Sequence, residues 1–332
     1  MKDIIQILLD DFKKVKDHSF VKILTVTNSA HEMRSYPTPI RLYGDLFITG
    51  VVSSDLEEIR EILTQVGDYS DQIFVDIEKK ISPRFMKSKL NSGSYFDILR
   101  NEFSHLPIRP ISPNNLTVNA VVTEITKEKL KNKSISVGVV GLGNIGFKIA
   151  QNSVELGCDT FLLSKNVGYR EIVLENAINF SKPRGTIANA VTVNSFEKLV
   201  LSSDVIIFAC PPNQFITDKN VSSFKDKLAI LDVGKGNISF DVITELGNVV
   251  WIDVGRELIK FIESDLNQDK RLSEINAKAE KLPSGMTLAG KYAVPGDMLV
   301  NFDGEKFYPF AEINNFGNYV RLSYEQILSL AE

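Results

Sequence analysis

Three glycines near the middle of the chain have the spacing of a phosphate-binding turn. Gly141, Gly143 and Gly146 follow an apolar stretch over residues 134–140 and open a segment, residues 144–156, whose apolar side chains recur at helical spacing. Between a strand and a helix, the first glycine permits a tight turn, the second admits a pyrophosphate and the third allows close packing, with the helix amino terminus facing the anion. A glycine-rich turn that binds nothing is the alternative. We therefore predict a dinucleotide site that includes Gly141, Gly143, Asn144, Ile145 and Gly146.

The second predicted strand, residues 160–163, ends where such a site would meet the adenosine ribose. NAD sites have an Asp or Glu about 20 residues past the glycines, which accepts a hydrogen bond from the ribose 2′-hydroxyl. This chain instead has Ser164, Lys165 and Asn166, which can all donate to a 2′-phosphate that a carboxylate would repel. The triplet predicts NADP as the cofactor. The alternative is NAD, with Lys165 as a solvated surface charge and the acidic partner elsewhere in the chain.

Two more strand ends are predicted to lie at the same edge of the sheet. Residues 204–209 lead into a Cys-Pro-Pro turn, and residues 227–233 lead into a Gly-Lys-Gly turn. In open parallel sheets, ligands bind beyond the carboxyl ends of the strands. We therefore add Cys210, Pro211, Pro212, Asp232 and Gly234 to the predicted cofactor site, and Lys235 as a catalytic-site residue that anchors the substrate or the nicotinamide ribose.

These turns belong to a chain of alternating strands and helices. Six strand signals with helices between them predict an α/β fold with a doubly wound parallel sheet, the Rossmann arrangement. After the second strand we expect a longer irregular stretch that contains residues 182–185. The predicted strands are residues 134–140, 160–163, 190–193, 204–209, 227–233 and 249–254, and the predicted helices are residues 144–156, 195–202 and 238–246.

The first third of the chain has the pattern of a smaller α/β unit, which we predict to bind the substrate. Helical spacing covers residues 4–12 and 56–66, and strand patterns cover residues 21–27, 45–52 and 72–77. A polar loop is expected after the first of these strands. It could hold a substrate carboxylate or simply be solvated, and it carries His31, Glu32, Arg34, Tyr36 and Arg41.

The catalytic acid or base is expected from this first unit, because no histidine follows Gly141. The candidates are His31 and Lys80, each of which follows a predicted strand. A histidine titrates near neutral pH, whereas a lysine needs a pKa that is strongly lowered by desolvation. For both residues the alternative is an ordinary solvated charge.

We predict three parts: an α/β substrate domain over residues 1–118, a dinucleotide-binding domain over 119–262 and a C-terminal extension over 263–332. The extension could cover the cleft or form a contact in a homodimer. It is expected to comprise a helix over 258–282, a hairpin that pairs 293–302 with 305–310 across Asp303 and Gly304, and a helix over 319–331.

Composition limits the classes of partner. The 332 residues carry a formal net charge of −4 without a basic block, which argues against nucleic acid and a membrane surface as partners. No apolar run approaches the roughly 18 residues that a membrane-spanning helix requires. Cys158 and Cys210 lack metal-site spacing. We predict a cytoplasmic protein with a small-molecule substrate and no metal site.

The cofactor part resembles the D-2-hydroxyacid dehydrogenases over residues 137–245. The matching pieces are the glycine turn, residues 203–212 and residues 231–236. In that family an arginine at the position of Lys235 holds the substrate carboxylate, so the resemblance implies this role for the lysine. The family's catalytic histidine near the end of the cofactor domain has no counterpart here, because the chain has only His18, His31 and His105.

The connection into the cofactor part resembles the shikimate and methylenetetrahydrofolate dehydrogenases. The resemblance rests on the polar turn at residues 113–119, the helix through Leu130 and the short approach to the first strand. These families bind NADP at an Asn-Arg-Thr-like triplet, which Ser164, Lys165 and Asn166 resemble. Their proton-transfer lysine implies a role for Lys79 or Lys80, although the surrounding family pattern is absent.

Together these patterns predict an NADP-dependent oxidoreductase that transfers a hydride to or from a small polar substrate, one that carries a carboxylate. The absence of the family's catalytic histidine leaves a second hypothesis for the function open. Under that hypothesis the protein is not a catalyst and binds a dinucleotide to sense redox state or to regulate a partner.

Overall fold

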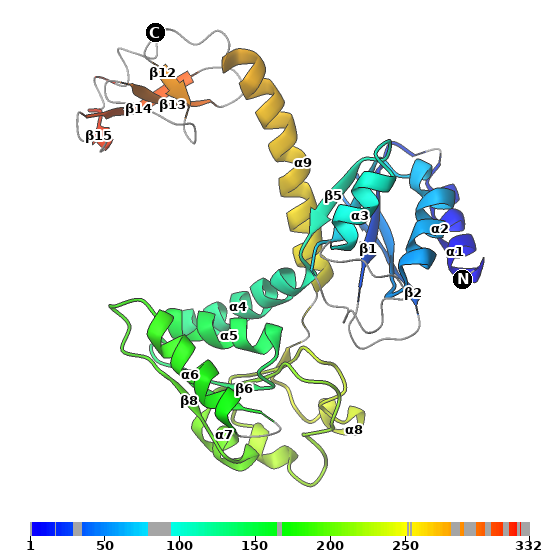
Figure 1. Ribbon diagram of the computed structural model, residues 1–332. Coiled ribbons are helices and arrows are strands. Elements are labelled where there is room, and N and C mark those ends of the chain that lie inside the picture. Colours follow the sequence, from blue (N-terminus) through cyan, green and yellow to red (C-terminus); the bar gives the residue numbers. More distant parts are fainter. Residues whose placement is uncertain are drawn as a thin grey trace. The chain divides into compact units, whose positions relative to one another are not determined.

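The computed structural model describes residues 2–16, 18–28, 35–78, 94–164, 168–250, 252, 254–279, 286–288, 297–302, 307–314, 319–323 and 326. The chain forms two compact units, Met1–Leu258 and Ile259–Glu332. The first unit contains two separate sheets, and the second unit contains one smaller sheet (Figure 1). No helix of the described residues combines the length and the apolar composition that crossing a bilayer would require.

The first sheet has five strands in the order β2-β3-β1-β4-β5. All neighbouring pairs are parallel except β2 and β3, which are antiparallel. The strand order reverses at β1: β3 lies on one side of β1, whereas β4 and β5 lie on the other. The elements are α1 (Lys2–Lys14), β1 (Val21–Thr27), β2 (Tyr36–Tyr43), β3 (Leu46–Val52), α2 (Leu56–Val66), η1 (Gly67–Tyr69), β4 (Gln72–Asp76), α3 (Tyr95–Glu102) and β5 (Ile108–Ile111).

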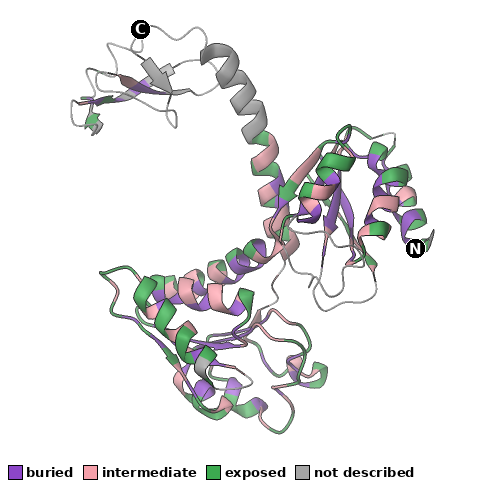
Figure 2. Ribbon diagram, viewed as in Figure 1, coloured by how far each residue is buried: buried purple, intermediate pink, exposed green. Residues whose placement is uncertain are grey.

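A single apolar core joins this sheet to α1, α2 and α3. Leu24 and Val75 from neighbouring strands meet Leu8 of α1 and Ile62 of α2, all of them almost completely buried. Each helix contributes apolar residues three or four positions apart, and these form one face. The central strands β1, β3 and β4 are accordingly mostly buried, whereas the outer faces of the helices are exposed (Figure 2).

A side-chain cap fixes where helix α2 begins. Asp55 caps α2, because its side chain accepts hydrogen bonds from the backbone N–H groups of Glu57 and Glu58.

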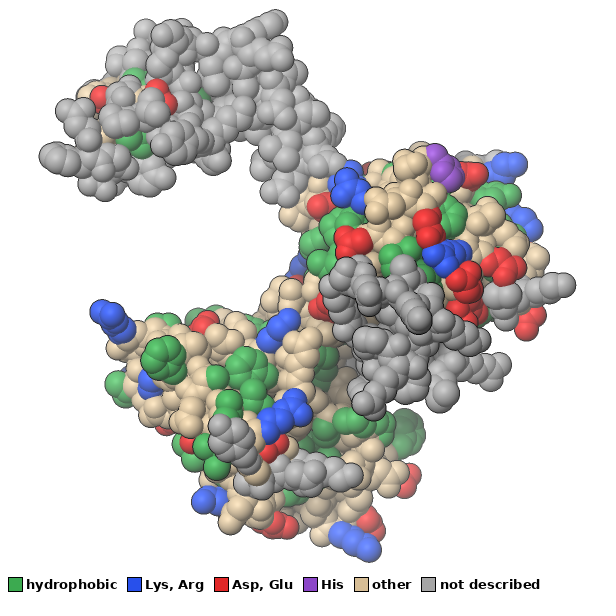
Figure 3. Space-filling model, viewed as in Figure 1, with side chains coloured by type: hydrophobic (Ala, Val, Ile, Leu, Met, Phe, Trp, Pro, Cys, Tyr) green, Lys and Arg blue, Asp and Glu red, His purple; other side chains and the backbone are tan. Residues whose placement is uncertain are grey.

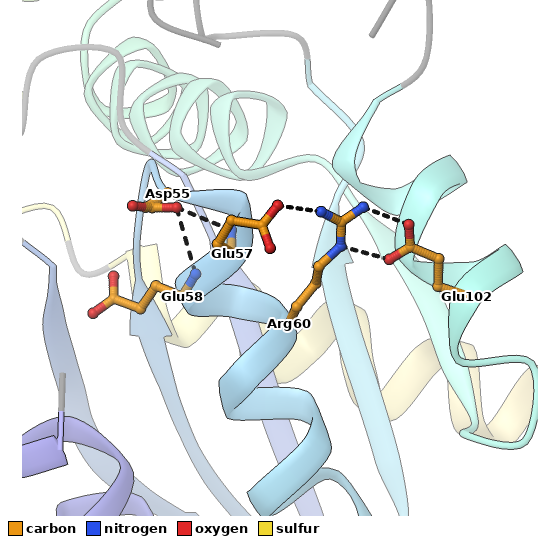
Figure 4. A network of polar contacts seen from close by, with 5 residues as sticks. All are labelled: Asp55, Glu57, Glu58, Arg60 and Glu102. Atoms are coloured by element: carbon orange, nitrogen blue, oxygen red, sulfur yellow. Dashed lines mark hydrogen bonds and ion pairs between the residues drawn. The ribbon is translucent and has the colours of Figure 1, made fainter. Parts of the chain in front are cut away.

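Arg60 of α2 connects this helix to α3. It forms ion pairs with Glu57 and with Glu102 of α3, and its Nε lies 2.7 Å from Glu102 Oε2 (Figure 4). This network ties α2 to α3 across their surfaces.

The second sheet has six parallel strands in the order β11-β10-β9-β6-β7-β8. This is the Rossmann order, and it confirms the predicted doubly wound fold. The elements are α4 (Pro113–Lys131), β6 (Ser136–Val140), α5 (Asn144–Glu155), β7 (Asp159–Leu163), α6 (Tyr169–Ser181), β8 (Ala190–Thr192), α7 (Phe196–Ser202), β9 (Val205–Phe208), η2 (Val221–Phe224), β10 (Ala229–Asp232), α8 (Phe240–Ile243) and β11 (Val249–Val250).

Helices cover both faces of this sheet. On one face α4, α5 and α6 pack against Val137, Val139 and Ile207. On the other face α7, η2 and α8 pack against Ile206 and Phe208. Strands that are buried on both sides are continuously apolar, which explains why residues 204–209 could be recognised as a strand in the sequence.

The second unit is built on α9 (Val254–Ala279), which begins in the first unit, and on a four-stranded sheet. Its strands β13 and β14 are antiparallel, which confirms the predicted hairpin pairing. Both predicted domain boundaries, 118/119 and 262/263, fall inside helices, α4 and α9, and the three-part division stays a prediction. The strands are β12 (Met286–Leu288), β13 (Met298–Phe302), β14 (Phe307–Ile313) and β15 (Tyr319–Arg321).

Three predictions of local structure were wrong. Residues 36–43 form strand β2 rather than a loop, so Tyr36 and Arg41 lie in a strand. Residues 169–181, expected to be irregular, form helix α6. Residues 319–321 form strand β15, whereas a helix was expected there.

Candidate functional site

The turn between β6 and α5 can be made only by glycine at its first position. Gly141 has φ +95°, a left-handed backbone that side chains disfavour. A Cβ atom there would lie 2.7 Å from the carbonyl oxygen of Ala209. The backbone N–H of Gly141 donates to the carbonyl oxygen of Leu163 over 2.8 Å, so the turn is fastened to the end of β7.

The other two glycines of the turn have different roles. A Cβ atom on Gly146 would lie 1.8 Å from the carbonyl oxygen of Gly141, so the close packing of α5 requires glycine here. A Cβ atom on Gly143 would meet nothing within 4 Å, and its φ of −75° is open to any residue. The fold therefore requires glycine at 141 and 146 but leaves open space beside Gly143.

That open space lies at the amino terminus of α5. The first hydrogen bond of the helix runs from Phe147 N to Gly143 O over 2.9 Å, so the N–H groups of Asn144, Ile145 and Gly146 precede the helical ladder. Gly143 caps the helix without a side-chain hydrogen bond. Free N–H groups and the helix dipole together favour an anion here.

The loops after β9 and β10 are held to each other by one buried amide. Asn237 is completely buried; its Nδ2 donates to Asp232 Oδ1 over 2.8 Å and to Cys210 O over 3.3 Å. The backbone N–H of Asn237 donates to Asp232 Oδ2 over 2.8 Å. Both oxygens of Asp232 are thus engaged by Asn237. This carboxylate holds the turn in place, and its predicted contact with the cofactor stays a prediction.

Lys235 lies at the top of this turn and is exposed. Its φ is +57°, a left-handed conformation that is uncommon for a residue other than glycine and is often found at functional sites. On one side, a Cβ atom on Gly234 would lie 1.8 Å from Cys210 O. The close approach of the two loops therefore fixes the backbone from which Lys235 projects.

Cys210 belongs to the same network and is half-buried. Its thiol donates to Asn237 Oδ1 over 3.5 Å. Burial, and to a smaller extent the charge of Asp232, raises the pKa of Cys210 to about 11. The thiol is therefore protonated at neutral pH and is not a nucleophile. The neighbouring Pro211 and Pro212 are exposed.

At the end of β7, Ser164 is hydrogen-bonded to a carboxylate from the first turn of α6. Ser164 Oγ lies 2.8 Å from Glu171 Oε1, and the backbone N–H of Gly168 donates to Glu171 Oε2 over 2.9 Å. Glu171 is buried, with 7% of its surface exposed. The hydrogen bond from Ser164 is the main reason why the pKa of Glu171 lies below its ordinary value.

The structure brings most of the predicted cofactor residues to one edge. The glycine turn, Ser164, the Cys-Pro-Pro turn and the Gly-Lys-Gly turn follow β6, β7, β9 and β10, which are consecutive neighbours in the sheet. Sequence reasoning missed Glu171 and Asn237. The predicted residues that lie outside the described part of the chain are His31, Glu32, Arg34, Lys79, Lys80, Lys165 and Asn166.

The two histidines that the structure describes are remote from strand carboxyl ends. His18 precedes β1 and contacts the ring of Phe20, with ring centroids 5.7 Å apart. His105 precedes β5 and contacts Phe103, with centroids 6.2 Å apart. Both are exposed and lie at amino ends of strands, opposite the edge where ligands bind in such sheets.

The charge and metal-ligand patterns of the described residues indicate no second site. On the face drawn in Figure 3, the described Lys and Arg side chains are scattered among Asp and Glu rather than gathered in one area. Among the described residues, no group of three or more His, Cys, Asp and Glu side chains could hold a metal ion.

Comparison with known proteins gave one curated relative and a set of solved structures. No family model matches the chain. A protein of Schizosaccharomyces pombe named "putative 2-hydroxyacid dehydrogenase" is 32% identical over 106 residues. That match covers 31% of this chain and 27% of the relative, so only about a quarter of the relative's length is involved.

The solved structures share much lower identity. L-tryptophan dehydrogenase from Nostoc punctiforme is 13% identical, with 62% of this chain and 58% of that chain covered and a TM-score of 0.39. Hetero-hexameric glutamate dehydrogenase from Thermus thermophilus is 12% identical, with 70% and 64% covered and a TM-score of 0.41. D-mandelate dehydrogenase from Rhodotorula graminis is 13% identical, with 70% and 80% covered and a TM-score of 0.30. The resemblance predicted from the sequence is thus confirmed: over part of its length this chain is similar to a protein named as a 2-hydroxyacid dehydrogenase.

Proposed function

We propose that this protein binds a nicotinamide dinucleotide at the carboxyl edge of its second sheet and transfers a hydride to or from a small substrate that carries a carboxylate. The glycine turn is the observation that carries the proposal. Gly141 and Gly146 are required by the fold, whereas Gly143 leaves space beside three N–H groups at the start of α5. A pyrophosphate in that space would accept hydrogen bonds from backbone and gain from the helix dipole.

Lys235 supports the second half of the proposal. Its ammonium group is exposed at the carboxyl end of β10, and its backbone is held left-handed by the loop network under it. An ammonium group attracts a carboxylate, although it lacks the two-pronged fork of an arginine. The S. pombe relative, which is named as a hydroxyacid dehydrogenase, supports a substrate of the same class.

The proton donor or acceptor is proposed to be His31 or Lys80. In the chain these residues follow β1 and β4, the two neighbouring parallel strands between which the strand order of the first sheet reverses. In open α/β sheets, ligands bind beyond the carboxyl ends of the strands beside such a reversal. The two described histidines, by contrast, precede strands. The cytoplasmic location and the homodimer stay predictions.

A second candidate function is non-catalytic binding of the dinucleotide, for redox sensing or for regulation of a partner. The observation that favours it is the absence of any histidine after His105 in the sequence. A protein of this kind would bind the cofactor through the same glycine turn and would need neither His31 nor Lys80.

Turnover separates the two functions. The full chain is incubated with NADH or NADPH and a panel of 2-oxo acids, imines and enones, and cofactor oxidation is followed by absorbance. We expect oxidation with at least one 2-oxo acid, and a large loss of kcat in either His31→Ala or Lys80→Ala. Binding of the dinucleotide without turnover on the whole panel would favour the regulatory function, and full turnover in both variants would remove these residues from the mechanism.

A further inference from the structure

The hydroxyl group of Ser164 has a fixed direction because of its partner. Ser164 directly follows β7, whose last carbonyl accepts from the Gly141 N–H of the glycine turn. Its Oγ lies 2.8 Å from Glu171 Oε1. An ionised carboxylate only accepts hydrogen bonds, so the serine must supply the proton. The proton of Ser164 therefore points at Glu171, and lone pairs of Oγ point elsewhere.

Glu171 is well suited to stay ionised and in place. Its second oxygen accepts from the backbone N–H of Gly168 over 2.9 Å, which closes the first turn of α6. The hydrogen bonds from Ser164 and from backbone lower the pKa of Glu171, so the carboxylate is charged at neutral pH. Only 7% of the residue is exposed, and it therefore acts on a ligand through Ser164 rather than directly.

The two forms of nicotinamide dinucleotide differ at the ribose 2′ position, which the end of the second Rossmann strand reads. A 2′-hydroxyl has a proton that it can donate to the lone pairs of Ser164. A 2′-phosphate is mainly a dianion at neutral pH and offers only acceptors. Placed beside Ser164, the phosphate would meet a second acceptor with the negative charge of Glu171 behind it.

We infer that Glu171 is a positioning residue that makes Ser164 an acceptor for the ribose 2′-hydroxyl, so that the site takes NAD in preference to NADP. The inference rests on the proposed function, since it requires a nicotinamide dinucleotide in the glycine turn. It reverses the preference that Ser164, Lys165 and Asn166 suggest in the sequence, where Ser164 was expected to donate. The acidic partner comes from the first turn of α6 instead of from the strand end.

The test measures dissociation constants of NADH and NADPH for the full chain and three variants, by calorimetry. Glu171→Gln keeps the shape and an acceptor for Gly168, but its amide can donate to Ser164 and free the serine proton. Ser164→Ala removes the acceptor altogether. Glu175→Gln is the matched control: it makes the same change one turn later in α6, where Glu175 Oε2 accepts from the backbone N–H of Thr192 over 2.8 Å.

We expect the wild type to bind NADH at least about tenfold more tightly than NADPH. Glu171→Gln should reduce this ratio by about tenfold, Ser164→Ala should reduce it as well, and Glu175→Gln should leave it unchanged. If Glu171 only capped α6, its replacement would weaken the binding of NADH and NADPH equally and leave the ratio of their dissociation constants unchanged.

Three results would overturn the inference. The first is that the wild type binds NADPH more tightly than NADH. The second is that folded Glu171→Gln has the same ratio of NADPH to NADH dissociation constants as the wild type. The third, decisive if Glu171→Gln does not fold, is that Ser164→Ala leaves this ratio unchanged. In each of these cases a dinucleotide binds, so the proposed function survives. If the wild type binds neither dinucleotide, the proposed function fails and the inference fails with it.

Discussion

The glycine turn allows the requirements of folding and of binding to be separated by two substitutions three residues apart. Gly146→Ala would place a methyl group 1.8 Å from the carbonyl oxygen of Gly141, which is backbone and cannot turn aside. Overpacking of this kind costs about 1–3 kcal/mol, and a clash with backbone belongs at the upper end. For a unit of this size, about 3 kcal/mol lowers Tm by roughly 6–12 °C.

Gly143→Val should leave the fold almost unchanged. The Cβ atom meets nothing within 4 Å, and the backbone of Gly143 is extended, with a negative φ that does not require glycine. The weaker capping of α5 by valine costs about 1 kcal/mol or less. The side chain would, however, fill the space proposed for the pyrophosphate and keep it from the N–H groups of Asn144 and Ile145.

The loss of affinity can be worked out from those two groups. A hydrogen bond to a charged acceptor contributes about 1.5–3 kcal/mol, so two of them contribute about 3–6 kcal/mol. Since about 1.4 kcal/mol changes a dissociation constant tenfold, Gly143→Val should weaken dinucleotide binding by roughly 10²- to 10⁴-fold. Calorimetric titration with NADH measures the affinity, and thermal unfolding of the same samples measures Tm. Unchanged affinity in Gly143→Val, or an unchanged Tm in Gly146→Ala, would refute the reasoning.

Three further predictions concern the neighbouring features. Lys235→Ala should raise KM for the carboxylate substrate at least about tenfold, with little effect on cofactor affinity. Lys219→Ala removes another exposed lysine and should change neither KM nor cofactor affinity. Steady-state kinetics measure KM, and calorimetric titrations measure cofactor affinity. The hydrogen bond from Arg60 holds the pKa of Glu102 below its ordinary value, so the pair stabilises the fold above about pH 4.3 and loses its effect as the pH falls through the lowered pKa. Arg60→Gln should therefore reduce the free energy of unfolding by about 0.5–1 kcal/mol at pH 7 and by less at pH 3, measured by urea titration, and an equal loss at both values would contradict the assignment. Because the pKa of Cys210 is raised to about 11, its reaction with iodoacetamide should be slow at pH 8 and accelerate towards pH 11, and fast labelling at pH 8 would show that the thiol is not protected.

The second sheet was largely predictable from the sequence because its strands are buried on both faces. Such strands are short continuous apolar runs, and residues 204–209 are an example. Helix α6 was missed for the opposite reason. Ile172 and Phe180 are apolar yet 53% and 93% exposed, so the helix shows no clean division into an apolar and a polar face. Its apolar residues gave no period from which a helix could be recognised.

Strand β2 was missed because it contains two prolines. Pro37 and Pro39 argue against a central strand, since proline cannot donate to a ladder of hydrogen bonds. In the structure β2 lies at the edge of the first sheet, where prolines are tolerated. A single sequence does not distinguish an edge strand with prolines from a loop.

The candidate site was predictable where it depends on backbone geometry. The spacing of the glycines at 141, 143 and 146 predicts a tight turn by itself. Asn237 gave no comparable signal, because its role depends on hydrogen bonds that include one to Cys210, 27 residues away. Glu171 was missed because the helix α6 that brings it back to Ser164 was not predicted. For Asn237, a polar residue directly after the Gly-Lys-Gly turn was the one available hint.

The fold requires glycine at two of the three positions of the turn but not at the third, and this difference has an evolutionary consequence. Selection for a folded protein alone would preserve Gly141 and Gly146, since side chains at these two positions collide with backbone. The same selection would be indifferent to Gly143, where a side chain meets open space. Homologues that have given up the dinucleotide but kept the fold should therefore drift first at the position of Gly143, so that this one site would record which lineages still use the ligand.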